Sequence, residues 1–283
     1  MLSPDRLKQK MSEPFRITSA ANPVVKTLKA LHLKKSRAES GLFLAEGARL
    51  ASEAAALGVW PEIMAVSAAA LERPQVKKLA SAASRHGARV IETSETILGQ
   101  IGKRDNPQTI IGAYRQRTFN LDDLPVKKPA LFIALEGVRD PGNLGTIMRT
   151  ADSVGADGVI LVGQTCDPFS VEAVRATMGS IFAMPLARAD FETFDAWRRG
   201  RDLLLVGASL KGVKPHDAFP AERGAIVFMG NEQSGLPETM EAACDALVKI
   251  PMKGRADSLN LAIATGVMLY DVWRRRDYAG ART

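Results

Sequence analysis

The chain has 283 residues, of which 46% are hydrophobic and 24% charged, and its formal net charge is +7. This composition is typical of a folded protein and excludes disorder as the dominant state. A chain of this length forms either one large domain or two smaller ones.

Two other classes of protein are also excluded. No uninterrupted apolar run approaches the roughly 18 to 20 residues that cross a bilayer, and the first residues contain no secretory signal. Two cysteines are too few for a disulfide framework or a structural zinc site with four cysteine ligands. The three histidines are far apart in sequence and show no zinc-binding spacing, which makes zinc-dependent hydrolysis improbable. We therefore expect a cytoplasmic enzyme or binding protein with no membrane partner and no metal.

Positive charge is concentrated near the start of the chain. The first 50 residues contain ten basic and four acidic side chains, a net charge of +6. Residues 22–39 place aliphatic side chains at helical spacing and most lysines elsewhere, which predicts one helix with a basic, solvent-facing side. Such a cluster attracts a phosphate backbone, although a solvated helix surface has the same pattern. The candidate nucleic-acid contacts are Lys26, Lys34, Lys35 and Arg37.

The first part of the chain alternates between predicted strands and helices. A short strand at 42–47 leads into a helix that Gly58 ends as a C-terminal cap. Further strands are expected at 61–67, 88–92 and 109–115, with helices near 75–86 and 94–102. This alternation predicts a small α/β domain over residues 15–114, preceded by a flexible tail at 1–14. Residues 115–129 are polar and contain two prolines, which indicates a linker.

Residues 130–283 have the pattern of a second α/β domain. Continuous apolar runs predict strands at 130–135, 158–163, 202–209 and 224–230. Helices are expected at 142–155, 171–182 and 260–276, and another begins near Pro237. Apolar strands that alternate with helices are typical of a parallel sheet covered on both faces.

Three glycine-bearing segments follow strands of this second domain, at 136–151, 228–240 and 250–266. Parallel sheets bind ligands outside the carboxyl ends of their strands, so these segments form the candidate site. The chain has no P-loop sequence and no GxGxxG turn between a strand and a helix. These absences argue against a P-loop NTPase and against a dinucleotide-binding site. Asn143 can cap the helix it precedes, and Ser258 is better explained as a helix N-cap than as a nucleophile. Each segment alone is equally compatible with a tight connection.

Together, the three segments are far more specific than any one of them. NLGTIMRTA at 143–151, GNEQSGLP at 230–237 and IPMKGRADSLNLAIA at 250–264 resemble motifs one, two and three of the SpoU/TrmH branch of the SPOUT methyltransferases. That family transfers a methyl group from S-adenosylmethionine to a ribose 2′-hydroxyl of tRNA or rRNA. The resemblance implies a parallel-sheet SPOUT domain with a deep trefoil knot, one of the rare exceptions to unknotted chains. It also implies an obligate homodimer, and an RNA-binding first domain similar to ribosomal protein L30e.

The resemblance assigns roles to individual residues. The polar positions grouped about the methyl-transfer centre correspond to Asn143, Arg149, Glu232, Ser258 and Asn260. The S-adenosylmethionine cleft corresponds to Ser209, Gly230, Ile250, Met252 and Leu259. In the family, the arginine at the position of Arg149 is proposed to activate the hydroxyl. A guanidinium stays protonated in proteins and is a poor base, so anchoring a phosphate or stabilising an alkoxide is equally compatible with the sequence. Gln233, Ser234 and Ala262 depart from the usual motifs.

The leading hypothesis is therefore S-adenosylmethionine-dependent methylation of a ribose 2′-hydroxyl in structured RNA. A basic α/β first domain favours 23S rRNA over tRNA, because tRNA-directed relatives commonly carry short helical extensions instead. A non-catalytic RNA-binding or ribosome-assembly factor on the same scaffold is the main alternative. A tRNA 2′-O-methyltransferase and an enzyme that methylates a small metabolite remain open.

Overall fold

The computed structural model describes residues 14–281, which form two compact units. The first unit contains the described residues up to Gln116 together with Phe169–Val171, and the second contains the rest. The tail expected at 1–14 lies outside the described residues except for Pro14.

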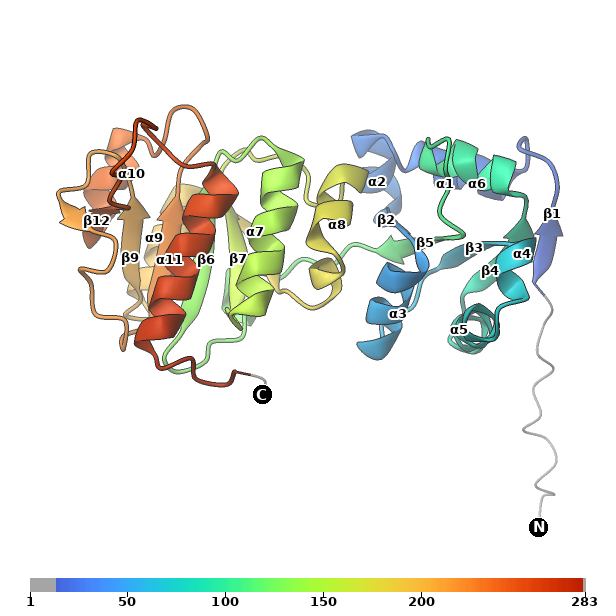
Figure 1. Cartoon of the computed structure of the whole chain (residues 1–283), viewed down its shortest axis with the longest axis horizontal. Coiled ribbons are helices and arrows are strands. Elements are labelled where there is room, and N and C mark those ends of the chain that lie inside the picture. The colour runs from blue at the N-terminus through green and yellow to red at the C-terminus, as the bar shows by residue number, and fades with distance from the viewer. Residues whose placement is uncertain (1–13, 282–283) are drawn as a thin grey trace, which may run out of the picture. The chain divides into compact units, whose positions relative to one another are not determined.

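The first unit is an α/β sandwich around a five-stranded mixed sheet. In their order across the sheet, the strands are β1 (Phe15–Ile17), β4 (Arg89–Thr93), β3 (Ile63–Ser67), β5 (Ile110–Arg115) and β2 (Leu42–Glu46). Strand β5 runs antiparallel to both of its neighbours, and the other pairs are parallel. The helices are α1 (Pro23–Ala30), α2 (Lys34–Ser40), α3 (Ala48–Ala56), α4 (Ala68–Leu71), α5 (Pro74–Arg85) and α6 (Glu95–Gly102). Apolar residues of α1 and α6 cover one face of the sheet, and those of α3 and α5 cover the other (Figure 1).

The single helix expected at 22–39 is wrong, because the chain breaks into α1 and α2 at residues 31–33. Asn22 caps α1 through the backbone N–H of Val24, and α2 begins after Leu33. The break turns Arg37 inward, where it is only 4% exposed. Its Nη1 donates to the carbonyl oxygen of Leu31 at 2.8 Å and so satisfies a carbonyl at the end of α1. The expectation that Arg37 lies on the solvent-facing side is therefore also wrong.

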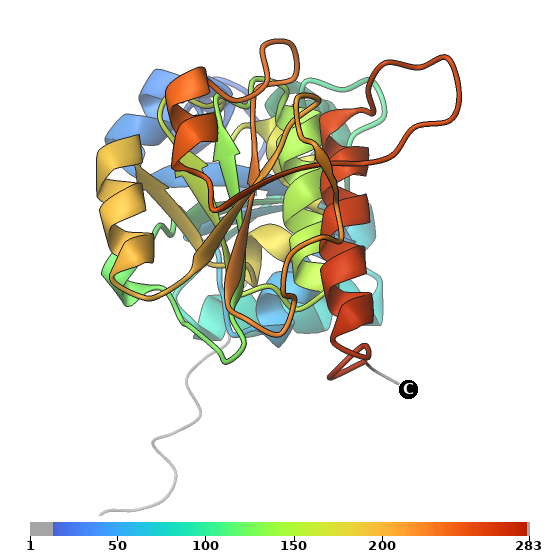
Figure 2. The same cartoon turned by 90° about the vertical axis from the view of Figure 1, so that its left-hand side faces the viewer.

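The second unit is built on a seven-stranded sheet in which every pairing is parallel. Across the sheet, the strands are β10 (Lys214–Pro215), β12 (Ala246–Lys249), β9 (Leu204–Ala208), β11 (Ala225–Met229), β6 (Leu131–Glu136), β7 (Gly158–Val162) and β8 (Leu186–Ala189). The main helices are α7 (Pro141–Ser153), α8 (Val171–Thr177), α9 (Phe191–Arg199), α10 (Glu238–Ala243) and α11 (Leu261–Arg275). Helices α7 and α11 lie side by side on one face, and α9 and α10 cover the other (Figure 2). The predicted parallel α/β sheet is confirmed.

Most of the segment expected to be a linker, 115–129, belongs to the second unit, which begins at Arg117. Phe119 forms a parallel bridge with Ala187 of β8. Leu121 and Leu124 are buried in the core of the second unit, at 7% and 5% exposure. These apolar side chains, scattered among polar residues, have no period that sequence reading detects.

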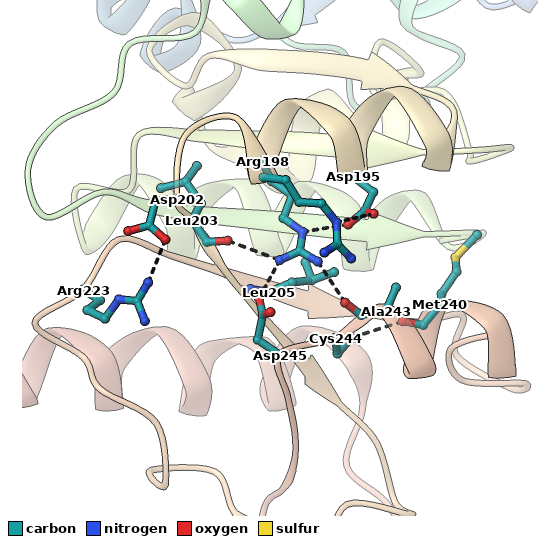
Figure 3. A network of polar contacts seen from close by, with 11 residues as sticks. Asp195, Arg198, Asp202, Leu203, Leu205, Arg223, Met240, Ala243, Cys244 and Asp245 are labelled. Carbon is teal, nitrogen blue, oxygen red and sulfur yellow. Dashed lines mark hydrogen bonds and ion pairs between the residues drawn. The ribbon is translucent and has the colours of Figure 1, made fainter.

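A buried arginine ties α9 to the strands beneath it (Figure 3). The Arg198 side chain is 3% exposed, and it donates through Nε to Asp195 at 2.7 Å and through Nη1 to Asp245. The Asp245 carboxylate also accepts from the backbone N–H of Leu205 in β9. A buried guanidinium with charged and backbone partners fixes the connection between α10 and β12. That connection leads into the third glycine-bearing segment.

Candidate active site

The three glycine-bearing segments meet at one edge of the seven-stranded sheet. Residues 137–140 follow β6, residues 230–237 follow β11, and residues 250–260 connect β12 to α11. Because these strands are parallel, their carboxyl ends lie at the same edge, where α/β sheets bind their ligands.

Glu232 joins the first two segments. Its Oε1 accepts a hydrogen bond from the backbone N–H of Asp140 at 3.1 Å, and its Oε2 accepts from that of Arg139 at 3.2 Å. The Nδ2 of Asn143 also donates to Oε1, at 3.3 Å. Burial alone would raise the pKa of Glu232, but backbone and Asn143 hydrogen bonds outweigh it and hold this pKa below its usual range. The carboxylate is therefore ionised at neutral pH.

Asn260 brings in the third segment. Its Nδ2 donates to Oδ1 of Asn143 at 3.0 Å, and its Oδ1 accepts from the backbone N–H groups of Ala262 and Ile263. Asn260 is therefore the N-cap of α11, a role that the sequence suggested for Ser258. Glu232, Asn143 and Asn260 form one hydrogen-bonded chain, which we call the Glu232–Asn143–Asn260 cluster.

Asn143 does not cap α7, contrary to expectation. The N-cap is Asp140, whose Oδ1 accepts from the backbone N–H of Asn143 at 2.6 Å. Asn143 lies within the first turn of the helix, so its side chain is free to contact the other two segments. Pro141 takes the first helical position, where its missing N–H leaves no hydrogen bond unmade.

Asn231 shapes the second segment, and the sequence analysis missed it. Its Nδ2 donates to the carbonyl oxygen of Gly137 at 2.7 Å. Its Oδ1 accepts from the backbone N–H groups of Gln233 and Ser234 at 2.9 and 3.2 Å. The signal was present, since an asparagine that follows a strand and precedes a turn commonly bonds its own backbone two residues on.

A cavity of about 330 Å³ lies beside the cluster, with Asn231 and Glu232 in its wall. All five residues expected in the cofactor cleft line it: Ser209, Gly230, Ile250, Met252 and Leu259. A Cβ atom on Gly230 would lie 2.2 Å from the backbone of Gly235 and Leu236, so only glycine permits this close approach. The wall is more apolar than polar, which suits a planar, uncharged ring with a few hydrogen-bonding groups at its edges.

The structure does not join Arg149 or Ser258 to the cluster. Arg149 is exposed on α7, and no hydrogen bond or ion pair links it to another residue in the part of the chain that the structure describes. Ser258 lines the cavity but has no hydrogen-bond partner among residues 14–281. Both side chains are therefore available to groups from outside this chain.

Cys166 lies at this edge, where its backbone N–H donates to the carbonyl oxygen of Val138 at 2.7 Å. Burial first, and the nearby Glu232, Asp140 and Asp167 carboxylates second, raise the pKa of Cys166 to about 11, so its thiol is protonated at neutral pH. Among the described residues, no group of His, Cys, Asp and Glu side chains is arranged to hold a metal ion. None of the helices in that part of the chain is both long and apolar enough to span a membrane.

Comparison with known families accounts for both units. The model of the SpoU rRNA Methylase family matches residues 130–270. The model of the MRM3-like substrate binding domain matches residues 22–112.

Individual proteins are similar over larger shares of the chain. The 23S rRNA (guanosine(2553)-2′-O)-methyltransferase RlmP of Bacillus subtilis is 29% identical over 256 residues, which cover 90% of this chain and 98% of that protein. The 23S rRNA (uridine(2479)-2′-O)-methyltransferase of Streptomyces viridochromogenes is 32% identical over 193 residues, 66% of this chain and 67% of the other.

A solved structure is more similar still. The AdoMet-bound rRNA methyltransferase from Sinorhizobium meliloti is 44% identical and superposes with a TM-score of 0.86, covering 92% of this chain and 97% of the other. A parallel α/β domain with its ligand edge built from these three segments defines a methyltransferase of the SPOUT class. The chain belongs to the SpoU rRNA methylase family.

Proposed function

We propose that this protein transfers the methyl group of S-adenosylmethionine to a ribose 2′-hydroxyl of 23S rRNA. The observation that carries the proposal is the Glu232–Asn143–Asn260 cluster, which joins all three family segments next to a cavity. The named functions of the Bacillus and Streptomyces relatives support 23S rRNA as the substrate.

The cavity fits S-adenosylmethionine, which is bound in the related Sinorhizobium structure. Gly230, Ile250 and Leu259 would hold it mainly through backbone groups and apolar contacts, and Ser209 and Met252 lie in the same wall. When bound, this cofactor supplies an activated methyl group on a positively charged sulfur.

The chain's own residues position the reaction. The cluster fixes the relative places of the three segments, so that a ribose hydroxyl reaches the cavity in one orientation. The unpartnered guanidinium of Arg149 binds a phosphate next to the reacting ribose or stabilises the developing alkoxide, and its planar donor fork suits either anion. Ser258, at the cavity wall, is available to hydrogen bond the substrate.

The first unit supplies the RNA-binding surface in this proposal. Lys26, Lys34 and Lys35 are exposed on α1 and α2, in the region that the substrate-binding family model matches. Arg37 is left out of this surface because it is buried. The similarity of this unit to L30e stays a prediction.

We also propose a homodimer, a trefoil knot in the second unit and a cytoplasmic location. Ile263 and Tyr270 support the dimer, since they are 58% and 45% exposed on α11 and form apolar surface that a second copy can cover. The free guanidinium of Arg149 fits a site that the second subunit completes. The knot is supported by the family resemblance, and ribosomal RNA as substrate would place the enzyme in the cytoplasm.

Methyl transfer to purified RNA tests the proposal. Full-length protein is incubated with labelled S-adenosylmethionine and with rRNA or tRNA from a strain that lacks the gene. We expect label in 23S rRNA, as an alkali-resistant 2′-O-methyl dinucleotide. Label in tRNA alone overturns the substrate, and binding of RNA without uptake of S-adenosylmethionine or its product favours a non-catalytic assembly factor.

A further inference from the structure

A second polar group lies in the cavity wall, away from the Glu232–Asn143–Asn260 cluster. Glu241 of α10 is 8% exposed and lines the cavity together with Ser209 and Lys211. The Ser209 hydroxyl donates to its Oε1 at 2.6 Å, and the Lys211 ammonium donates to its Oε2 at 3.0 Å. Glu241 lies outside the three family motifs, between the second and the third.

This carboxylate is charged, and its counter-ion points to solvent. Hydrogen bonds from Ser209 and Lys211 lower the pKa of Glu241, and Glu241 in turn raises the pKa of Lys211. The Lys211 side chain is 71% exposed and that of Glu241 only 9%. The negative end of the pair therefore lies at the cavity, and water screens the positive end.

Glu241 has unused capacity to accept hydrogen bonds. An ionised carboxylate has about four acceptor positions, and the donors from Ser209 and Lys211 occupy two of them. Ser209 differs, because its single proton is already donated to Glu241 and its oxygen accepts from the backbone N–H of Lys211 at 3.2 Å. A hydrogen-bond donor in the cavity therefore finds its acceptor in Glu241.

We propose that Glu241 binds the ribose hydroxyls of S-adenosylmethionine in this cavity, with Ser209 and Lys211 as the residues that position it. The inference rests on the proposed function, because it assumes that the cavity holds this cofactor. A neutral diol is favoured over the ammonium group of the cofactor. The Lys211 ammonium already contacts the carboxylate, so a second cation there would be repelled, whereas two hydroxyls meet only acceptor oxygens.

Binding measurements on the full chain test this assignment. Isothermal titration compares wild type, Glu241→Gln and the matched control Glu238→Gln, which changes an exposed glutamate on the same helix. The ligands are S-adenosylhomocysteine and its 2′-deoxy and 3′-deoxy derivatives, altered only in the cofactor's own ribose. Glu241→Asp, which retains the charge on a shorter side chain, replaces Glu241→Gln if thermal melting shows that the glutamine variant does not fold.

We expect Glu241→Gln to bind S-adenosylhomocysteine about 10- to 100-fold more weakly than wild type, as loss of hydrogen bonds to a charged group predicts. The difference should shrink to less than about threefold for a derivative that lacks the contacted hydroxyl, and Glu238→Gln should bind as wild type does. Unchanged affinity in Glu241→Gln, or an equal loss for all three ligands, overturns the assignment alone. A wild-type protein that binds none of them overturns the proposed cofactor as well.

Discussion

Asn260 and Asn143 are 117 residues apart in the chain, yet the Nδ2 of Asn260 lies 3.0 Å from the Oδ1 of Asn143 and donates to it. The other end of the Asn260 amide caps α11, and the Nδ2 of Asn143 donates to Glu232. Each amide therefore has one possible orientation, because a flip would place two donors or two acceptors against each other. One side chain both begins a helix and orders the candidate active site.

These two roles of Asn260 can be separated by substitution. Asn260→Ala removes the cap and the bond to Asn143, so we expect a loss of about 1 kcal/mol in the free energy of unfolding and most of the methyl-transfer rate. Asn260→Ser retains a capping oxygen but does not reach Asn143, so its stability should stay near wild type while its rate falls with that of the alanine variant. Denaturant unfolding and turnover with saturating cofactor measure both. A serine variant with full turnover would show that the Asn143 contact has no part in catalysis.

The pKa of Glu232 predicts how the site responds to acid. Because the folded protein lowers this pKa, the ionised form stabilises the fold above the unfolded value of about 4.3, and this stability is lost as the pH falls through the folded pKa. Glu232→Gln should melt at a lower temperature than wild type at neutral pH, because the amide that replaces one oxygen cannot accept the bonds from residues 139 and 140. The two melting temperatures should converge as the pH falls through the folded pKa of Glu232. Parallel curves from pH 3 to 8 would contradict an ionised Glu232.

The three motif segments lie at one edge of the sheet, and parts of them are recognisable in the sequence because they depend on local chemistry. Gly230 follows a strand and must lack a side chain, and Asn260 precedes a periodic apolar run, so both are marked in the sequence. Glu241 is different, since its partners Ser209 and Lys211 come from a distant strand end. Only the packing of α10 beside β9 brings them together, and no spacing within the chain reports that packing.

The errors in the fold have a similar physical origin. The apolar stripe of residues 22–39 is compatible with one helix, but the chain breaks at residues 31–33, where the buried guanidinium of Arg37 donates to the carbonyl oxygen of Leu31. Strand β8 and helix α9 were not predicted, because β8 is a four-residue edge strand and α9 mixes its buried Phe194 and Trp197 with many charges. In both regions, tertiary contacts outweigh the local helix and strand propensities of the residues.

We expect Arg149 to act on the RNA substrate and not on the cofactor. Its guanidinium is exposed and has no partner within residues 14–281, so Arg149→Ala should unfold at the same temperature as wild type and bind S-adenosylhomocysteine equally well. We expect the alanine variant to lose most turnover. Arg149→Lys retains the charge without the planar fork, and it should recover little of the rate if two parallel hydrogen bonds to an anion are needed. A lysine variant with near-normal turnover would argue against the fork, and an equally active alanine variant would remove Arg149 from the mechanism.

In α2, we expect Lys34 and Lys35 to affect RNA binding and Arg37 to affect stability. Lys34 and Lys35 are exposed, so changing both to alanine should leave the melting temperature unchanged, weaken RNA binding and reduce the slope of log affinity against log salt by about 2. Arg37→Ala leaves the carbonyl of Leu31 without its buried donor, so it should lower the free energy of unfolding by about 1 to 3 kcal/mol. The salt dependence of this variant's RNA binding should match that of wild type, because a buried guanidinium releases no counterions from RNA. Filter binding over a range of salt concentrations, together with denaturant unfolding, measures both effects. A reduced salt slope in Arg37→Ala would mean that Arg37 contacts RNA after all.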